Sequence, residues 1–356
     1  MVYSATRYTL KDGARFSREF IIMLLAIFLG IIAALFLSYF DYQVYTKFWP
    51  VIAVFCVIIM LVLFKWGTGP SSRPDARTWL SIGPINFQPS ELVKIGFIIT
   101  FGVHLDKVKE KINNIFSILQ LGAHAAVPIV LVAATGDMGS ALVFMVIAIV
   151  MMFVAGVHWG YFLGGIALVG AATPLIWTYV LKQLQKDRFL ALIYPDLYPD
   201  IIYQQQRGLN AIGAGGITGQ GLFKGAYTQA GAVPESQNDM IFSVVGEELG
   251  FIGCITALLL IVLITVRIIY VGKKSSEQST NLICTGMAAM IIGQMIINVG
   301  MCLMLLPVIG ITLPFFSAGG SSNLCVYLGI GIVMSIYRHN CDTGAVNIRV
   351  YDSLKK

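Results

Sequence analysis

The stretch Val233–Gly253, VPESQNDMIFSVVGEELGFIG, decides how this chain must fold. An apolar run begins directly after Asp239 and carries Glu247 and Glu248 within it. If the run is a membrane helix, Glu247 lies about 12 Å along the axis from Asp239, at ~1.5 Å per residue. An acidic side chain at that depth is costly unless it has a partner, so it is by default a candidate for function. The stretch predicts a membrane helix with one carboxylate at its mouth and two inside.

The composition extends this prediction to the whole chain. Of the 356 residues, 57% are hydrophobic and 12% are charged, whereas soluble domains carry about 25% charged residues. The expected fold is an all-α polytopic membrane helical bundle, a single integral membrane domain over residues 1–356. Runs of about 18 or more apolar residues predict nine membrane helices, near residues 20–40, 49–66, 88–104, 114–134, 140–157, 160–181, 240–265, 281–303 and 313–337.

Cysteines, histidines and charge exclude other classes of protein. The six cysteines include no CxxC pair, which indicates neither a disulfide framework nor a zinc site. The four histidines lack HExxH spacing, and His124, inside a predicted helix, is expected to be a packed, hydrogen-bonded side chain. The net charge of +6 comes from dispersed residues, which fits basic cytoplasmic loops and argues against a nucleic-acid partner.

Basic residues in the short loops predict how the chain faces the membrane. If the nine helices alternate, three basic clusters share one side, which the positive-inside rule makes cytoplasmic: Lys107, Lys109 and Lys111; Arg267, Lys273 and Lys274; and Arg338. The connections 135–139 and 304–312 and a long extracellular loop, 182–239, then lie outside. The basic N-terminal tail also falls outside, against the rule, and no signal peptide precedes the first apolar run.

Polar and helix-breaking segments gather on the outer side. In the segment 75–97, Pro84 and Pro89 indicate a turn, and the sequence PSEL predicts a helix start. Lys94 lies one turn inside that helix, where it suggests function, although its long side chain could also reach the outer interface. Arg77 and Trp79 fit an interfacial anchor as well as a ligand role.

Two further outer segments have a structural as well as a functional interpretation. Asp137, in the link GDMGS, suits the N-cap of a helix, which is compatible with a role in a site. The stretch AIGAGGITGQGLFKG lacks the GxxxxGK[ST] order of a Walker loop. Its backbone amides could cradle an anion, or it could be a flexible loop. The amphipathic stretch before it, broken by Pro195 and Pro199, could lie in the interface plane.

The remaining outer residues suggest chemistry. Asp239 precedes the apolar residues Met240, Ile241 and Phe242, whose desolvation should raise the pKa of its carboxylate toward the range useful to a general base. It could also simply cap its helix. Glu247 and Glu248 could be buried partners of Lys94 or of other polar groups. Between Asn298 and Asn323, two prolines and a Gly-Gly pair interrupt the helices, as where broken helices line a cavity. Together these segments predict an outer-face site for an amphiphilic, phosphorylated substrate. An enzyme fits this site, and a transporter fits it almost as well.

Five segments in this order resemble the SEDS family of bacterial membrane proteins, the group of RodA, FtsW and SpoVE: RTWLSIGPINFQPSELVK, GDMGSALV, AIGAGGITGQG, the opening stretch, and LPVIGITLPFFSAGGSS. The resemblance implies a ten-helix bundle in the cytoplasmic membrane. It implies a peptidoglycan glycosyltransferase that polymerises lipid II at the outer face, in cell elongation, division or sporulation. It also implies a class B penicillin-binding protein as partner, whose transpeptidase domain crosslinks the product.

The resemblance also assigns site residues. Asp239 matches the essential aspartate, which would act as general base on the acceptor 4-hydroxyl in an inverting transfer with polyprenyl pyrophosphate as leaving group. A divalent cation, Mg²⁺ or Mn²⁺, is expected at the pyrophosphate, but no metal ligands can be named. The candidates for substrate binding are Lys94, Arg77, Trp79, Gln88, Glu91, Asp137, Arg188, Arg207, Glu235 and Ser317.

The chain departs from the family pattern at several positions, so it is expected to be a divergent member. Asn238 stands where threonine is usual, Gly136 where proline is usual, Ala318 where an aromatic is usual, and Arg207–Gly208 where Gln-Ser is typical. The stretch VYSAT at residues 2–6 resembles the outer end of the family's first helix, most of which the chain is expected to lack. Restoring that helix would turn the outer basic tail into a short loop.

Two other functions remain open. The chain could be a lipid-linked precursor flippase or transporter, with Lys94, Glu247 and Glu248 along the path. It could also be a non-catalytic scaffold for a penicillin-binding protein.

Overall fold

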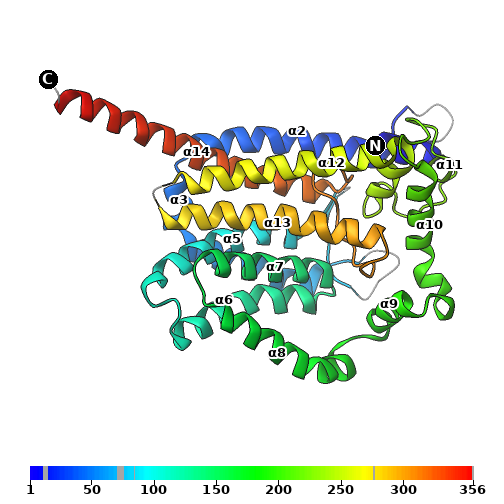
Figure 1. Ribbon diagram of the computed structural model, residues 1–356, viewed down its shortest axis with the longest axis horizontal. Helices are drawn as coiled ribbons and strands as arrows, with labels where there is room; N and C mark the ends of the chain where they lie inside the picture. Colours follow the sequence, from blue (N-terminus) through cyan, green and yellow to red (C-terminus); the bar gives the residue numbers. More distant parts are fainter. Residues whose placement is uncertain (11–14, 70–75, 84, 276, 355–356) are drawn as a thin grey trace. The chain divides into compact units, whose positions relative to one another are not determined.

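The computed structural model describes residues 1–10, 15–69, 76–83, 85–275 and 277–354, without the side chains of residues 82, 85, 180 and 340–354. Within this part of the chain all nine predicted helices form (Figure 1). They are α2 (Arg18–Tyr39), α4 (Trp49–Trp66), α5 (Pro89–Lys107), α6 (Ile115–Ala134), α7 (Met138–Val154), α8 (Trp159–Leu175), α12 (Ile241–Lys273), α13 (Gln278–Cys302) and α14 (Gly320–Leu354). The predicted all-α fold class is confirmed.

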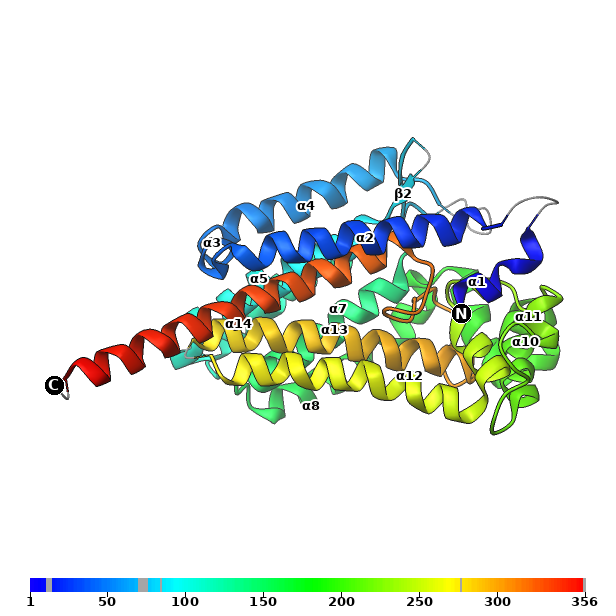
Figure 2. The ribbon, with the colours of Figure 1, turned by 90° about the horizontal axis from the view of Figure 1, so that it is seen from above.

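Shorter elements connect the long helices. The helical ones are α1 (Val2–Ala5), η1 (Arg7–Thr9), α3 (Tyr42–Lys47), η2 (Lys109–Lys111), η3 (Ile176–Val180), α9 (Gln183–Ile193), η4 (Pro195–Leu197), α10 (Pro199–Gly215) and α11 (Ala226–Gln229). A hairpin not expected from the sequence pairs β1 (Leu80–Ile82) with β2 (Ile85–Phe87), and Leu80 faces Phe87 across it. The turn residue Pro84 lies outside the described residues. Figure 2 shows this hairpin at the end of α4, where Thr68 pairs with Trp79.

The length and composition of the helices make this a multi-pass membrane protein. Of the described helices, seven are long and apolar enough to cross a membrane: 18–39, 49–66, 115–134, 159–179, 241–273, 278–302 and 320–339. Helix α7 is equally apolar but has 17 residues. Helix α5 has 19 residues and is buried along most of its length, with a charged pair inside it. A helix of that kind is shielded from lipid by its neighbours.

The last helix begins at Gly320, so the predicted start near residue 313 is wrong. Pro314 has no N–H to donate. Phe315 has φ 69°, a left-handed conformation that ends regular helix. The hydroxyl of Ser317 instead accepts a hydrogen bond from the N–H of Leu313 at 2.8 Å, which closes a turn in front of α14.

The chain divides into two compact units. Unit 1 comprises Met1–Leu24, His158–Val262 and Gly293–Gly319, and unit 2 comprises Leu25–Val157, Leu263–Ile292 and Gly320–Lys356. Three of the five boundaries fall within the helices α2, α12 and α13, and the other two fall before α8 and α14. A division of this kind does not define domains, so the assignment of one integral domain stays a prediction.

In unit 1, much of the long segment 182–239 is helical (Figure 1). Pro195 and Pro199 begin η4 and α10, where the missing N–H would have no helical partner anyway. Helix α10 packs against α9 and α11, and α11 also contacts the N-terminal α1.

The glycine-rich segment that follows α10 supplies hydrogen-bond partners to the backbone of α12 where that helix is interrupted. Gly250, with φ 66° and ψ −166°, interrupts that helix and leaves nearby backbone groups without helical partners. A side chain at Gly219 would collide with the carbonyl of Glu248, so this close approach requires glycine. The segment is not the flexible loop that its sequence allowed, because its backbone pairs with α12, and the anion-binding alternative stays a prediction. The bonds are Gln220 N to Glu247 O (2.9 Å), Gly221 N to Glu248 O (3.0 Å) and Phe251 N to Gly216 O (2.9 Å).

Two buried carboxylates of α12, those of Glu247 and Glu248, bind α1 and the residues around α11. The carboxylate of Glu247 accepts hydrogen bonds from Tyr227 N at 2.6 Å, Thr228 N at 2.9 Å and Thr228 Oγ1 at 2.6 Å. Oε1 of Glu248 accepts from Ser4 Oγ and from Gln229 Nε2. Both side chains are fully buried. They therefore anchor α11 and α1. Of the two kinds of partner predicted from the sequence, Lys94 or other polar groups, these carboxylates bind polar groups of α11 and α1.

In unit 2, α5 is the central helix. It packs against α4, α6, α7 and α14, and Figure 1 shows α6 and α7 running side by side next to it. A side chain at Gly96 of α5 would meet Cys56 of α4, so the glycine allows these two helices to approach closely.

We expect Glu247→Gln to loosen residues 225–229. A hydrogen bond to a charged acceptor contributes about 2 kcal/mol, and the amide NH₂ would face backbone donors. Hydrogen–deuterium exchange of these amides should rise more than tenfold, the equivalent of about 1.4 kcal/mol. The control is Glu110→Gln, at an exposed position. Equal exchange in both variants would contradict the anchoring role.

Candidate active site

The predicted site residues divide between the two units. Unit 1 holds Arg188, Arg207, Glu235, Asp239 and Ser317. Unit 2 holds Arg77, Trp79, Gln88, Glu91, Lys94 and Asp137. Within each unit, hydrogen bonds bring several of them together.

Asp239 lies two residues before α12 and is partly buried. Its backbone carbonyl accepts a hydrogen bond from Asn298 Nδ2 at 2.8 Å, and Cys302 Sγ lies 3.6 Å from the same oxygen. Asn298 Nδ2 also donates to Ile311 O at 2.7 Å. One buried amide thus ties the turn before α12 to the loop after α13. Because this amide binds the backbone, it positions Asp239 without occupying its carboxylate.

Asn298 was not among the predicted site residues. A buried amide in the apolar part of a membrane helix is costly unless it is bonded, and that signal could have identified Asn298. The amide of Gln294, one turn earlier in α13, is also fully buried but has no hydrogen-bond partner among the described residues. Of these two amides in one helix, Asn298 holds the candidate base.

Ser317 and its neighbour reinforce the same turn. Ser317 Oγ donates to Asn238 O at 2.7 Å. Ala318 N donates to Gln237 O at 2.8 Å. Ser317 is buried, so the structure places this predicted substrate-binding residue beside Asp239 as a support for its backbone.

Glu235 lies at the exposed side of the turn. Its carboxylate accepts from Asn238 Nδ2 at 2.9 Å, and its carbonyl accepts from Met240 N at 3.2 Å. Its φ of 52° is uncommon for a residue other than glycine. Strained backbone of this kind is often found next to functional residues.

The two arginines of unit 1 have different surroundings. Arg188 of α9 donates to Val308 O at 2.7 Å. The guanidinium of Arg207 in α10 lies 5.1 Å from the ring centroid of Tyr203 and is partly exposed. Gln205, which the sequence did not single out, is buried and donates to the carbonyls of both Met301 and Leu306 at 2.8 Å. Helices α9 and α10 therefore bind the chain between α13 and α14.

In unit 2, Asp137 is the centre of a buried polar cluster. Its Oδ1 accepts from Ser140 N at 3.0 Å, which confirms the predicted N-cap of α7. Its Oδ2 accepts from Gln88 Nε2 at 2.7 Å and from Ser90 Oγ at 3.1 Å. The backbone N–H of Gln88 donates to Ser321 Oγ at 3.1 Å. The cluster joins the starts of α5, α7 and α14.

Lys94 and Glu91 form a buried ion pair within α5. Lys94 Nζ lies 2.8 Å from Glu91 Oε1, and the two side chains are 0% and 6% exposed. Lys94 therefore does not snorkel to the interface. Buried pairs of this kind contribute little net stability, because desolvation offsets their attraction. A charge kept at such a cost is a candidate for substrate contact.

Arg77 and Trp79 lie in the segment before the hairpin. Arg77 N donates to Thr135 O at 2.8 Å, which holds this segment beside the link that contains Asp137. Arg77 is exposed and Trp79 is partly buried, so both interpretations from the sequence, interfacial anchor and substrate ligand, fit their positions.

The described residues contain no group of three or more His, Cys, Asp or Glu side chains that could hold a metal ion. The polar side chains at the Asp239 turn include Asn298, Ser317 and Glu235, and the partner of Lys94 in unit 2 is Glu91. Unit 1 thus holds a candidate general base, Asp239, and unit 2 holds a buried cation, Lys94.

We expect Lys94→Met to destabilise the protein by about 3–5 kcal/mol, because Glu91 is left as an unpaired buried charge. The double variant Glu91→Leu/Lys94→Met should recover most of the loss. Thermal unfolding midpoints in detergent measure both. The surface pair Lys109–Asp106, at 3.0 Å, supplies the control Lys109→Met, with an effect within about 0.5 kcal/mol. If Lys94→Met were as stable as the parent, the buried charge of Glu91 would not depend on Lys94 for its stabilisation.

Comparison with known proteins places these features in one family. The FtsW/RodA/SpoVE family, described as "Cell cycle protein", matches residues 1–342. Peptidoglycan glycosyltransferase MrdB of Escherichia coli K12 is 28% identical over 314 residues, which cover 87% of this chain and 83% of MrdB. Stage V sporulation protein E of Bacillus subtilis is 31% identical over 355 residues, 96% of this chain and 93% of the relative.

A solved structure described as "Structural coordination of polymerization and crosslinking by a peptidoglycan synthase complex" has a similar fold. Its TM-score is 0.80 at 25% identity, over 95% of each chain. The family match and this similarity each extend over nearly the whole sequence. The chain therefore belongs to the FtsW/RodA/SpoVE family.

Proposed function

We propose that this chain is a peptidoglycan glycosyltransferase that polymerises lipid II, with Asp239 as general base. The observation that carries the proposal is the hydrogen bond from Asn298 to the Asp239 carbonyl, the Asn298 clamp, which holds the backbone of an acidic residue just before a membrane helix. Family membership over residues 1–342 supports the activity, because relatives such as MrdB are named peptidoglycan glycosyltransferases.

In the proposed reaction, the carboxylate of Asp239 accepts the proton of the acceptor sugar's 4-hydroxyl as its oxygen attacks the donor anomeric carbon. The bond from that carbon to the pyrophosphate oxygen breaks, and polyprenyl pyrophosphate leaves with the electron pair. One attack on the opposite face inverts the anomeric carbon. Correct placement of a general base contributes about 10²–10⁴-fold to such a step, which is why a backbone clamp would matter.

Negative charge develops on the pyrophosphate, and the proposed counter-charges are Lys94 and Arg77, with Arg188 and Arg207 as further candidates. Lys94 is desolvated, so its attraction to a phosphate would be weakly screened. The partner Glu91 holds the lysine in place. A divalent cation, Mg²⁺ or Mn²⁺, would have to take most of its ligands from the pyrophosphate and water.

The site is proposed to face the outside of the cytoplasmic membrane. Asp239 precedes α12, whereas Arg267, Lys273 and Lys274 lie at the far end of that helix and its following loop. Basic residues prefer the cytoplasmic side. The proposed partner is a class B penicillin-binding protein, in keeping with the synthase complex whose structure is similar.

The transport alternative has less support from the structure. Its path would use Lys94, Glu247 and Glu248, but both carboxylates of α12 bind α1 or the region of α11. Groups engaged in this way would have to break structural bonds in each transport cycle. The scaffold alternative needs no such groups. An assay of lipid II polymerisation distinguishes a scaffold from an enzyme.

We expect Asp239→Asn to abolish lipid II polymerisation, because an amide cannot accept the proton. The measurement is glycan polymer formed by the purified protein with its penicillin-binding protein partner supplied. Asp196→Asn, at an exposed position of the same unit, should leave polymerisation unchanged. Equal polymer from the parent and Asp239→Asn would remove this residue from the mechanism. No polymer from the parent, despite intact partner binding, would favour transport or scaffolding.

We expect Asn298→Leu to lower the polymerisation rate about 10²-fold, because a misplacement near 1 Å can cost that much. Gln294→Met is the matched control, since removing a buried amide that has no partner is nearly neutral. Unfolding midpoints separate lost folding from lost positioning. If both variants polymerise at the parent rate, the clamp does not position the base.

A further inference from the structure

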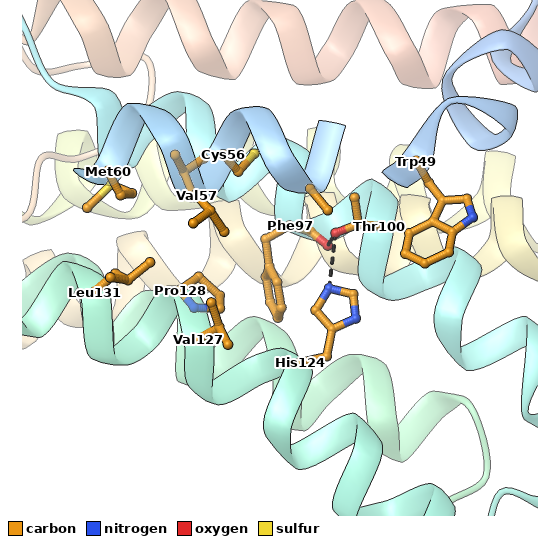
Figure 3. A pocket seen from close by; sticks show the side chains of 12 residues that line it. Trp49, Cys56, Val57, Met60, Phe97, Thr100, His124, Val127, Pro128 and Leu131 are labelled. Carbon is orange, nitrogen blue, oxygen red and sulfur yellow. Dashed lines mark hydrogen bonds between the residues drawn. The ribbon is translucent and has the colours of Figure 1, made fainter. Parts of the chain in front are cut away.

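A cavity of about 240 Å³ lies between α4, α5 and α6 of unit 2 (Figure 3). Each helix contributes one stripe of side chains, and along α4 the stripe runs from Trp49 to Met60. Those eleven steps correspond to about 16 Å along the helix axis. The cavity is therefore a slot parallel to the helices. Its lining comprises Trp49, Ala53, Cys56, Val57, Met60, Val93, Phe97, Thr100, His124, Val127, Pro128 and Leu131.

The polar groups of the slot satisfy one another. Thr100 Oγ1 donates to Phe97 O at 3.2 Å, so it must accept from His124 Nε2, also at 3.2 Å (Figure 3). A neutral His124 then has an unprotonated Nδ1, which accepts from His104 Nδ1 at 2.9 Å. This chain of bonds leaves His124 no donor or acceptor for a ligand. The interior of the slot is in effect apolar and suits a hydrocarbon chain.

The slot reaches the surface that faces lipid. Val127, which lines it, is 47% exposed. On α4, the neighbours of the lining residues, Val54 and Phe55, are 59% and 50% exposed. A chain could enter from the bilayer without crossing a polar layer.

One end of the slot carries positive charge. Trp49 begins α4, and Lys107 Nζ lies 4.4 Å from its ring centroid. Lys47, two residues before Trp49, is exposed. The positive-inside rule makes this the cytoplasmic end, because Lys107, Lys109 and Lys111 lie there.

The carboxylates near this end are largely engaged. Asp106 is bonded to Lys109 at 3.0 Å, and Asp41 accepts from Gln43 N at 2.9 Å. Glu110 is exposed beyond them. Glu277, hydrogen-bonded to Tyr42 at the start of α3, adds a further carboxylate at this end. Among the described residues neither Lys107 nor Lys47 belongs to an ion pair, so these two ammonium groups can complement an anionic headgroup.

We propose that this slot binds one acyl chain of an anionic phospholipid from the cytoplasmic leaflet, with the lipid phosphate at Lys107 and Lys47. The tail lies along α4 toward Met60. Binding at this site is independent of the glycosyltransferase reaction, and its ligand enters from the opposite leaflet to the proposed active site.

The test is native mass spectrometry of the full chain in detergent, titrated with phosphatidylglycerol or with phosphatidylcholine of the same acyl chains. Phosphatidylglycerol should bind several-fold more tightly to the parent. Ala53→Phe, which fills the slot, should weaken phosphatidylglycerol binding at least tenfold. Val54→Phe adds the same ring on the exposed face of α4 and should leave binding unchanged.

A second variant tests the headgroup without altering the packing of the slot. Lys107→Gln, at an exposed position, should weaken phosphatidylglycerol about fivefold, the equivalent of ~1 kcal/mol per basic residue, and leave phosphatidylcholine unchanged. Ala53→Leu replaces Ala53→Phe if the larger variant lowers the unfolding midpoint.

Three results would overturn the proposal. Equal affinity of the parent for both lipids would remove the headgroup site. Equal weakening of phosphatidylglycerol binding by the Ala53 and Val54 variants would mean that the lipid binds non-specifically around the membrane helices and not in the slot. Unchanged lipid binding with loss of a partner protein's membrane helix, on filling the slot, would make it a protein interface instead.

Discussion

The break of α12 at Gly250 is the constraint on which unit 1 depends. A membrane helix that is interrupted must have its freed backbone groups satisfied by protein, because lipid offers no hydrogen bonds. Residues 216–221 meet that requirement with their own backbone, and Glu247 and Glu248 fix the residues beyond them. The long segment 182–239 is therefore built into the bundle's hydrogen bonding. Asp239 lies at the start of the same helix and gains a defined position from it.

The same requirement explains the composition of the candidate site. Asp239 is held through its carbonyl by Asn298, and its turn is held by Ser317. Such contacts fix the backbone that carries the Asp239 carboxylate, and a fixed backbone is what a preorganised general base would need. Several residues proposed as ligands thus serve first as supports, and catalytic placement and stability share the same bonds.

In unit 2, buried polar groups are stabilised by one another, in an ion pair and in hydrogen-bonded clusters. Lys94 and Glu91 neutralise each other one turn inside α5, and Asp137 accepts from three donors. The histidine chain of the slot closes in the same way. In each case a group that the sequence marks as unusual in a membrane helix has a nearby partner. The slot differs from the two clusters because its remaining surface is hydrocarbon.

The sequence by itself determined the nine helices, the N-cap at Asp137, the start of α5 and the importance of the segment around Asp239, because apolar length, proline and capping residues act locally. It missed the hairpin, the late start of α14 and the Gly250 break, which depend on left-handed residues and distant backbone partners. It could not show that Asn298 binds the Asp239 carbonyl, or that Glu247 and Lys94 have different partners. Those pairings join residues far apart in the chain, so only the tertiary structure decided which buried polar group satisfies which.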